Sequence, residues 1–101
     1  MVRVRQHREA RKEFEALPAI VQDKVVLVLA AIGEDPLARG LAREVLRGYG
    51  KRRVLTWGTV YRGIAYRMAW EVVGPEDALV YAYGPHEGFY GRLERRAKAV
   101  R

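Results

Sequence analysis

Three short runs of β-branched and aromatic residues follow one another between residues 53 and 83, with glycine-containing turns between them. The runs are Arg53 to Trp57, Tyr61 to Trp70 and Ala78 to Tyr83. We interpret Gly58-Thr59 as a tight hairpin turn and Gly74-Pro75-Glu76-Asp77 as a second turn. Because strands joined by turns this short pair antiparallel, the sequence predicts an antiparallel sheet in the second half of the chain.

Helical spacing occupies both ends of the chain, after a short strand signal at Val2 to Arg5. Pro18 sits well in the first turn of a helix that runs to about Ile32, where Gly33 supplies the stop. Gly84-Pro85 opens a last helix. The apolar positions are Ala10, Phe14 and Leu17 in the first helix, and Phe89, Leu93 and Ala97 in the last.

The order of elements is therefore βααβββα, and the expected class is α+β. A helical hairpin packs on a small antiparallel sheet, a C-terminal helix follows, and the helices gather on one face. Leu37 to Leu46 carries only weak helical spacing. The length of 101 residues predicts a single domain over residues 1–101 with one core.

The second helix is apolar almost all round, through Val25 to Leu29. A helix of this kind needs cover on more than the stripe that faces the sheet. Full burial in the core is the simpler interpretation. A partner protein or a second copy of the chain is the alternative.

The net charge and the absence of cysteine limit the classes of function that this chain can have. Lys and Arg number 19 against 12 Asp and Glu, a net charge of +7, which indicates a polyanionic partner such as RNA, or else a basic surface kept for solubility. The chain has no cysteine, which excludes disulfides, thiolate zinc sites and cysteine nucleophiles. We expect no metal and no cofactor. The longest apolar run, Val25 to Ile32, is far short of the ~20 residues of a membrane span, so we expect a cytoplasmic protein.

Three segments together carry a family resemblance: Leu46 to Val54, Tyr61 to Tyr66, and Gly84-Pro85-His86 with Phe89-Tyr90. In this order and spacing they resemble the RelE/ParE toxin superfamily, over about residues 2 to 97. The resemblance implies the toxin of a type II toxin–antitoxin pair, commonly an endoribonuclease that cuts mRNA in the ribosomal A site. It also implies an acidic, partly disordered antitoxin that wraps the toxin and holds it inactive in a hetero-oligomer.

Metal-free RNA cleavage needs a base for the ribose 2′-OH, an acid for the departing 5′ oxygen, and cations at the phosphorus. His86 is the candidate acid, because it lies at a strand-to-helix junction and its ordinary pKa is near neutral. The resemblance implies the other three roles. They fall on Glu44 as the base, Arg62 in Tyr-Arg as the phosphate-binding cation, and Tyr90 as a residue that stacks on a base or orients the phosphate.

Each assignment has a structural alternative. Glu44 fits equally a solvated helix glutamate paired with a neighbouring arginine, and Tyr90 fits a core aromatic. Glu87 is a second candidate base, although a glutamate in the first turn of a helix is ordinarily explained by the helix dipole. His7 lies in a charged segment and is a weaker candidate than His86.

Further cations surround the predicted site. Arg47, Lys51 and Arg53 lie just before or on the strand next to Arg62, and we expect them to bind RNA. If Gly58-Thr59 is the whole loop, Arg53 and Arg62 are diagonal neighbours that reach one phosphate. A register slip of one residue would exchange Arg53 for Arg52. A basic run closes the chain at Arg95, Arg96, Lys98 and Arg101.

One departure from the family pattern favours other functions. Several family members carry two lysines on the first hairpin strand, where this chain has Arg53 and then apolar Leu55. The alternatives to the nuclease are a ParE-like inhibitor of DNA gyrase and a relative that binds RNA or a partner without catalysis.

Overall fold

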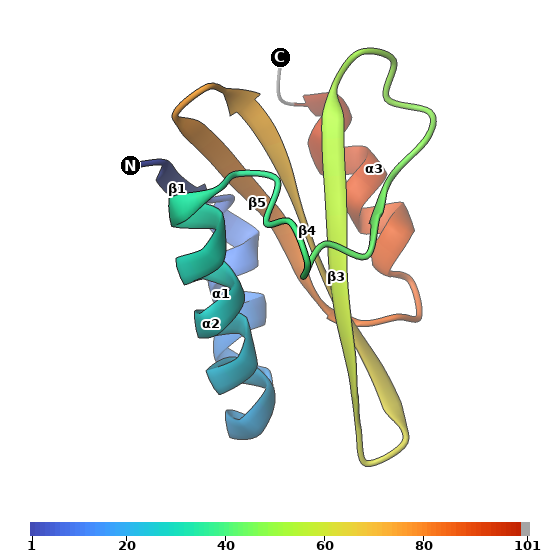
Figure 1. Cartoon of the computed structure of the whole chain (residues 1–101). Helices are drawn as coiled ribbons and strands as arrows, with labels where there is room; N and C mark the ends of the chain where they lie inside the picture. The colour runs from blue at the N-terminus through green and yellow to red at the C-terminus, as the bar shows by residue number, and fades with distance from the viewer. Residues whose placement is uncertain (100–101) are drawn as a thin grey trace.

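A five-stranded sheet runs through the middle of the protein, with helices packed on both of its faces (Figure 1). The computed structural model describes residues 1–99. The elements are β1 (Arg3–Gln6), α1 (Arg8–Glu15), α2 (Ala19–Glu34), β2 (Glu44–Val45), β3 (Arg53–Tyr61), β4 (Ile64–Gly74), β5 (Asp77–Pro85) and α3 (Phe89–Ala99). The predicted α+β class is confirmed.

The strand order across the sheet is β1-β5-β4-β3-β2. Antiparallel pairing joins β2 through β5, as the short turns predict. β1 adds a parallel pair with β5, in which Arg3 lies opposite Asp77. No short turn in the sequence predicts this pair, because two helices separate β1 from the other strands along the chain. The sheet is therefore mixed.

The hairpin between β3 and β4 turns at Arg62-Gly63 and not at Gly58-Thr59, so the predicted turn was wrong. Both turn residues have positive φ, 51° and 78°, which is the requirement of a two-residue hairpin turn of type I′. Gly58 and Thr59 continue β3 instead and pair with Arg67 and Tyr66 of β4. A glycine inside a strand can also mark the close approach of another group. At Gly58 that group is the Arg67 side chain.

The two faces of the sheet carry separate cores. α1 and α2 pack on one face around Trp70 and Met68, and α3 packs on the other around Phe89 and Tyr81. The prediction that all helices gather on one face was therefore wrong for α3. Its buried stripe was predicted correctly, since Phe89, Leu93 and Ala97 are fully buried. The helix begins at Phe89, because β5 continues to Pro85.

α2 covers the sheet with one face only. Val21, Val25, Val28 and Ile32 are buried, as the 3.6-residue period requires. Ile20, Val26 and Leu27 stay exposed, with Leu27 at 69%. Full burial of this helix was the wrong interpretation, and an apolar strip faces outward. No helix within residues 1–99 is both long and apolar enough to cross a membrane.

The segment after α2 forms no helix, contrary to the weak spacing of Leu37 to Leu46. It crosses the edge of the sheet and adds the two-residue strand β2 beside β3, with Glu44 opposite Thr56. Ala38 anchors the crossing in the core, and the Trp70 indole donates to the carbonyl of Pro36 at 2.8 Å. The segment thereby carries residues 46–52 to the face of the sheet that α3 occupies.

Candidate functional site

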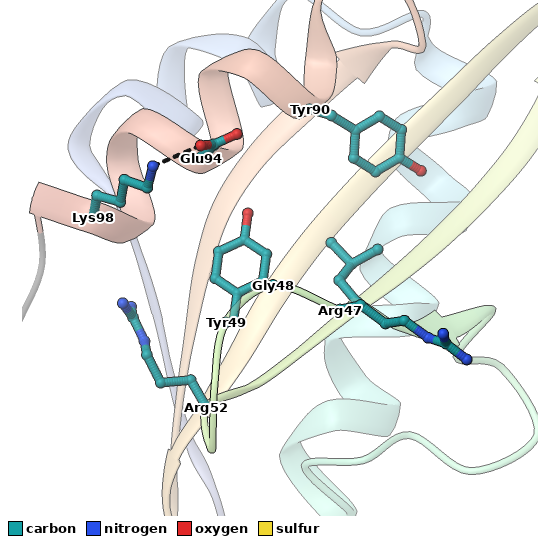
Figure 2. A pocket seen from close by; sticks show the side chains of 8 residues that line it. Arg47, Gly48, Tyr49, Arg52, Tyr90, Glu94 and Lys98 are labelled. Carbon is teal, nitrogen blue, oxygen red and sulfur yellow. Dashed lines mark hydrogen bonds and ion pairs between the residues drawn. The ribbon is translucent and has the colours of Figure 1, made fainter.

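A pocket of about 470 Å³ opens between residues 46–52 and the outer side of α3. The segment before β3 contributes Arg47, Tyr49 and Arg52. α3 contributes Tyr90, Glu94 and Lys98, the last two joined by an ion pair of 2.7 Å. Figure 2 shows the Tyr49 ring between Arg47 on one side and Arg52 on the other. The pocket thus combines two aromatic rings with an arginine at each end.

Tyr49 keeps its proton at neutral pH. Burial raises the pKa of its phenol, and the nearby Glu94 carboxylate raises it further. A protonated phenol donates a hydrogen bond, which suits an anionic ligand. The local backbone presents it because Gly48 and Gly50 have positive φ, 92° and 63°, so the chain turns sharply on either side of Tyr49.

His86 lies in the turn between β5 and α3, exposed to solvent. Its backbone N–H donates to the carbonyl of Ala65 at 2.8 Å, which fixes the turn against β4. The imidazole meets the Tyr90 ring edge to face, with centroids 5.5 Å apart and planes at 75°. Tyr90 is in turn held against the buried Phe89 ring at 5.3 Å. The structure therefore brings His86 and Tyr90 together at the rim of the pocket.

Arg67 is a candidate that sequence analysis missed. It lies on β4 opposite Gly58, on the face that α3 covers. Its Nη1 donates to the carbonyl of Tyr66 at 3.2 Å, while its Nε is buried without a hydrogen-bond partner among residues 1–99. A buried guanidinium N–H with no acceptor is unusual. Arg67 as a whole is half-buried, so its other N–H groups make it a candidate to bind an anionic ligand.

Two signals in the sequence point to Arg67. Tyr66-Arg67 is a second Tyr-Arg step, five residues after Tyr61-Arg62. Gly58 is the other signal, because a Cβ there would lie 2.8 Å from the Arg67 Cδ. Only glycine at this position lets the Arg67 side chain lie flat across the neighbouring strand.

Arg62 and Arg53 do not meet. Arg53 begins β3 and Arg62 follows its far end, so the nine residues of the strand separate them by roughly 30 Å. Arg62 forms the hairpin tip, where its guanidinium lies 5.4 Å from the centroid of the Tyr61 ring. The prediction that both reach one phosphate was therefore wrong. Arg52, which the alternative register favoured, lines the pocket.

Glu44 lies on a strand and not on a helix. Residues opposite each other in a sheet share a face, so Glu44 lies on the same side as Thr56, and thus on the side of α3. The Thr56 hydroxyl beside it is fully buried and has no partner among the described residues. Glu44 itself is exposed and does not line the pocket.

The remaining cations lie apart from the pocket or are paired. Lys51 is exposed and lines a second pocket next to the first. Arg96 is bound to Glu13 at 2.7 Å, and Lys98 to Glu94. Arg101 of the predicted basic run lies outside the described residues. Residues 1–99 hold no cluster of three or more side chains suited to a metal ion.

A buried polar network supports the floor between the two pockets. Arg52 donates to both carboxylate oxygens of Glu71, at 2.9 and 2.7 Å, and the Tyr81 hydroxyl donates to the same carboxylate at 2.6 Å. Burial alone would raise the pKa of Glu71, but the hydrogen bonds from Arg52 and Tyr81 outweigh it and hold the pKa below its usual range. Glu71 is therefore a carboxylate at neutral pH, and it locks the Arg52 side chain in place.

No protein-family model and no curated protein matches this sequence. Solved structures do match. The isolated E. coli RelE toxin is 19% identical, with a TM-score of 0.64 over 99% of this chain and 100% of that chain. RelE in the intact E. coli RelBE toxin–antitoxin complex is 20% identical, with a TM-score of 0.62 over 83% and 95%.

An archaeal structure gives the same result. The RelE–RelB complex from Pyrococcus horikoshii matches at 18% identity and a TM-score of 0.65, over 83% of this chain and 93% of that chain. At this level of identity the likeness establishes the fold, so this chain has the RelE-like fold that the sequence resemblance implied. What such a fold does depends on its site.

Proposed function

We propose that this protein is the toxin of a type II toxin–antitoxin pair and that it cleaves mRNA without a metal ion. The observation that carries the proposal is the contact of His86 with Tyr90, at the rim of a pocket with an arginine at each end. The half-buried Arg67, on the face of the sheet that α3 covers, supports it. The likeness of the fold to RelE toxins makes this class the first to test.

In the proposed reaction, the ribose 2′-OH attacks the neighbouring phosphorus, and the bond from phosphorus to the 5′ oxygen breaks. The upstream product then ends in a 2′,3′-cyclic phosphate. The His86 imidazolium gives its proton to the departing 5′ oxygen. Glu44, which lies on the same side of the sheet, is the proposed acceptor of the 2′-OH proton.

Arginines and tyrosines hold the substrate in this scheme. Arg67 and Arg47 stabilise the negative charge that builds on the phosphoryl oxygens, because guanidinium donors match phosphate geometry. Tyr90 and Tyr49 offer faces on which bases of a single strand stack. Arg62 lies at the far end of β3, and Arg53 shares the face of Leu55, on the α1/α2 side of the sheet. Both are proposed to bind RNA elsewhere along its length.

The proposal includes a partner and a place of action. We propose that an acidic antitoxin neutralises the net charge of +7 and holds the toxin inactive, and that the toxin acts in the cytoplasm on mRNA bound to ribosomes. E. coli RelE and the archaeal RelE have been solved in complexes with their RelB antitoxins, which supports a partner of this kind.

The His86→Gln variant tests the chemistry. On ribosomes programmed with mRNA, we expect cleavage to slow by roughly 10² to 10⁴ fold, because general acid catalysis contributes in that range. His7→Gln is the matched control. His7 accepts from the backbone N–H of Glu9 at the start of α1, and its loss should leave the rate unchanged. Primer extension gives the rates, and the upstream product is analysed for a cyclic phosphate.

Two results would count against the proposal in different ways. Cleavage by His86→Gln at the wild-type rate would assign the acid to another group. If the unmutated protein leaves mRNA intact, the nuclease proposal fails, and inhibition of gyrase supercoiling is then the next activity to assay.

A further inference from the structure

We propose that a second pocket, which adjoins the first at Arg52, binds further phosphates of the same RNA strand. This inference rests on the proposed function and names the path that its substrate takes. The second pocket has a volume of about 740 Å³. Its polar lining is Arg5, Lys51, Arg52 and Glu71, and Val72 and Leu79 contribute apolar walls.

Arg52 is the link, because it lines both pockets. Its position is fixed by the two hydrogen bonds to Glu71 and by a third to the Tyr81 hydroxyl at 3.1 Å. About a third of the Arg52 side chain remains exposed, at 31%. An arginine held in this way presents its free edge to a ligand without the loss of side-chain entropy that a mobile arginine suffers.

The other two cations of the second pocket are poorly matched by protein carboxylates. Lys51 has no carboxylate within 4.0 Å among residues 1–99. Arg5 lies 3.8 Å from Asp77, but Arg3 holds the same carboxylate more closely, at 3.0 Å. With Glu71 neutralised by Arg52, Arg5 and Lys51 leave an excess of positive charge beside an apolar wall.

The side chains of the first pocket indicate the direction in which the RNA strand runs. Tyr49 stands between Arg47 and Arg52, and Tyr90, whose ring contacts His86, lies on the α3 side of that pocket (Figure 2). Proteins that bind single strands combine a positive groove along the backbone with aromatic faces for the bases. A strand that is cut beside His86 would therefore continue past Tyr49 and Arg52 to Arg5 and Lys51.

The test compares a short and a long RNA, of about four and about twelve nucleotides, within the range that such grooves accommodate. Their 2′-hydroxyls are methylated so that they bind without being cut. Fluorescence anisotropy over a salt series measures the affinity of each. For the wild-type protein, we expect the long RNA to bind more tightly and with a steeper salt dependence.

The variant removes both free cations, as Arg5→Ala with Lys51→Ala. We expect the ratio of long to short affinity to fall toward one. The salt slope for the long RNA should decrease by roughly 1.4, about 0.7 for each lost phosphate contact. The control is Arg8→Ala with Arg11→Ala on α1, which removes the same charge from exposed positions on the other side of the sheet. Its ratio should stay near the wild-type value.

Each outcome decides one question. An equal effect of both double variants would show a response to net charge and overturn the subsite, as would an unchanged ratio in the Arg5/Lys51 variant. A wild-type protein that binds neither RNA overturns the subsite, whereas the proposed function is decided separately, by cleavage of mRNA on ribosomes. Lys51→Glu, a single change in an exposed turn, repeats the test should the double variant fail to fold, and it should lower the ratio in the same direction.

Discussion

A single glycine positions the arginine that sequence analysis missed. Gly58 lies in the middle of β3, directly opposite Arg67, and the arginine side chain extends across it. A side chain at position 58 would force the Arg67 side chain out of its present position. At the scale of the residue, the proposed site thus depends on the absence of a Cβ at Gly58 as well as on the charge of Arg67.

We expect Gly58→Ala to weaken RNA binding by roughly ten- to a hundredfold, because a hydrogen bond from a charged group contributes about 1.5–3 kcal/mol. The added Cβ would lie 2.8 Å from the Arg67 Cδ, so the side chain must move. Anisotropy with methylated RNA measures the affinity. Gly33→Ala is the control, since nothing lies within 4 Å of a Cβ there. Wild-type affinity in Gly58→Ala would remove Arg67 from the proposed site.

At the scale of the element, side chains complete an edge of the sheet that no strand covers. β1 pairs with β5 only as far as Val80. Beyond it, the Arg96 guanidinium donates to the carbonyl of Tyr81 at 2.8 Å, and the N–H of Tyr83 donates to Glu13 at 3.2 Å. Glu13 also binds Arg96 at 2.7 Å, so one carboxylate joins α1, β5 and α3. The free edge of β5 is thereby protected from pairing with another chain.

Glu13→Gln should therefore destabilise the protein by roughly 1.5–3 kcal/mol at neutral pH. Burial alone would raise the pKa of Glu13, but the hydrogen bonds from Arg96 and from the Tyr83 N–H outweigh it and lower the pKa. A lowered pKa means that this stability is present above the ordinary value of 4.5 and is lost as the pH falls through the folded-state pKa. The difference between wild type and variant should thus shrink in acid.

Urea unfolding at neutral pH and at about pH 3 measures this difference. Glu15→Gln is the matched control, two residues away on α1 but exposed and in no ion pair among the described residues. It should leave the free energy of unfolding within about 0.5 kcal/mol of the wild type. A Glu13→Gln protein as stable as the control would mean that the contacts to α3 contribute nothing.

α2 offers a second prediction at this scale, because its two faces differ in burial although both are apolar. Leu27→Gln should change the free energy of unfolding by no more than about 0.5 kcal/mol, since Leu27 is 69% exposed. Val25→Ala should lower the free energy of unfolding by roughly 1–3 kcal/mol, since Val25 is only 1% exposed. Thermal unfolding followed by circular dichroism compares them. Equal losses in both variants would mean that the outer face of α2 is covered.

The whole molecule is built from two cores that share one sheet. Both tryptophans report on the α1/α2 side, where Trp70 is buried and Trp57 packs against the same core. Leu93 lies in the other core, under α3. Because β3, β4 and β5 contribute side chains to both faces, we expect the two cores to unfold together.

We expect Leu93→Ala to lower the free energy of unfolding by roughly 2–5 kcal/mol, as a cavity under α3 requires. The shift should appear equally in tryptophan fluorescence and in far-ultraviolet circular dichroism, because the two cores unfold together. Urea titrations followed by both signals test this. A fluorescence transition that stays at the wild-type midpoint, while the helical signal shifts, would show that the α3 side unfolds independently.

The elements themselves follow from the amino-acid sequence. The 3.6-residue period predicted the buried stripe of α3 at Phe89, Leu93 and Ala97, and the run of apolar residues from Ala78 to Tyr83 predicted β5. These signals are local, because helix and strand periods depend on neighbours a few residues apart. The ordered segments Leu46 to Val54 and Gly84 to Tyr90 likewise indicated the RelE-like fold.

How segments far apart in the sequence lie relative to one another was decided by the tertiary structure alone. Gly58 and Gly63 are both glycines in this run, and only the register of β3 with β4 and the positive φ at Arg62 and Gly63 show where the chain turns. That register places Arg62 at the hairpin tip and Arg67 on the face of the sheet that α3 covers. Nor does any local pattern state that α3 takes the face opposite α1 and α2, which is what brings Tyr90 into the same pocket as Arg47. The sequence determined which side chains the site has available, and contacts between distant segments determined which of them meet.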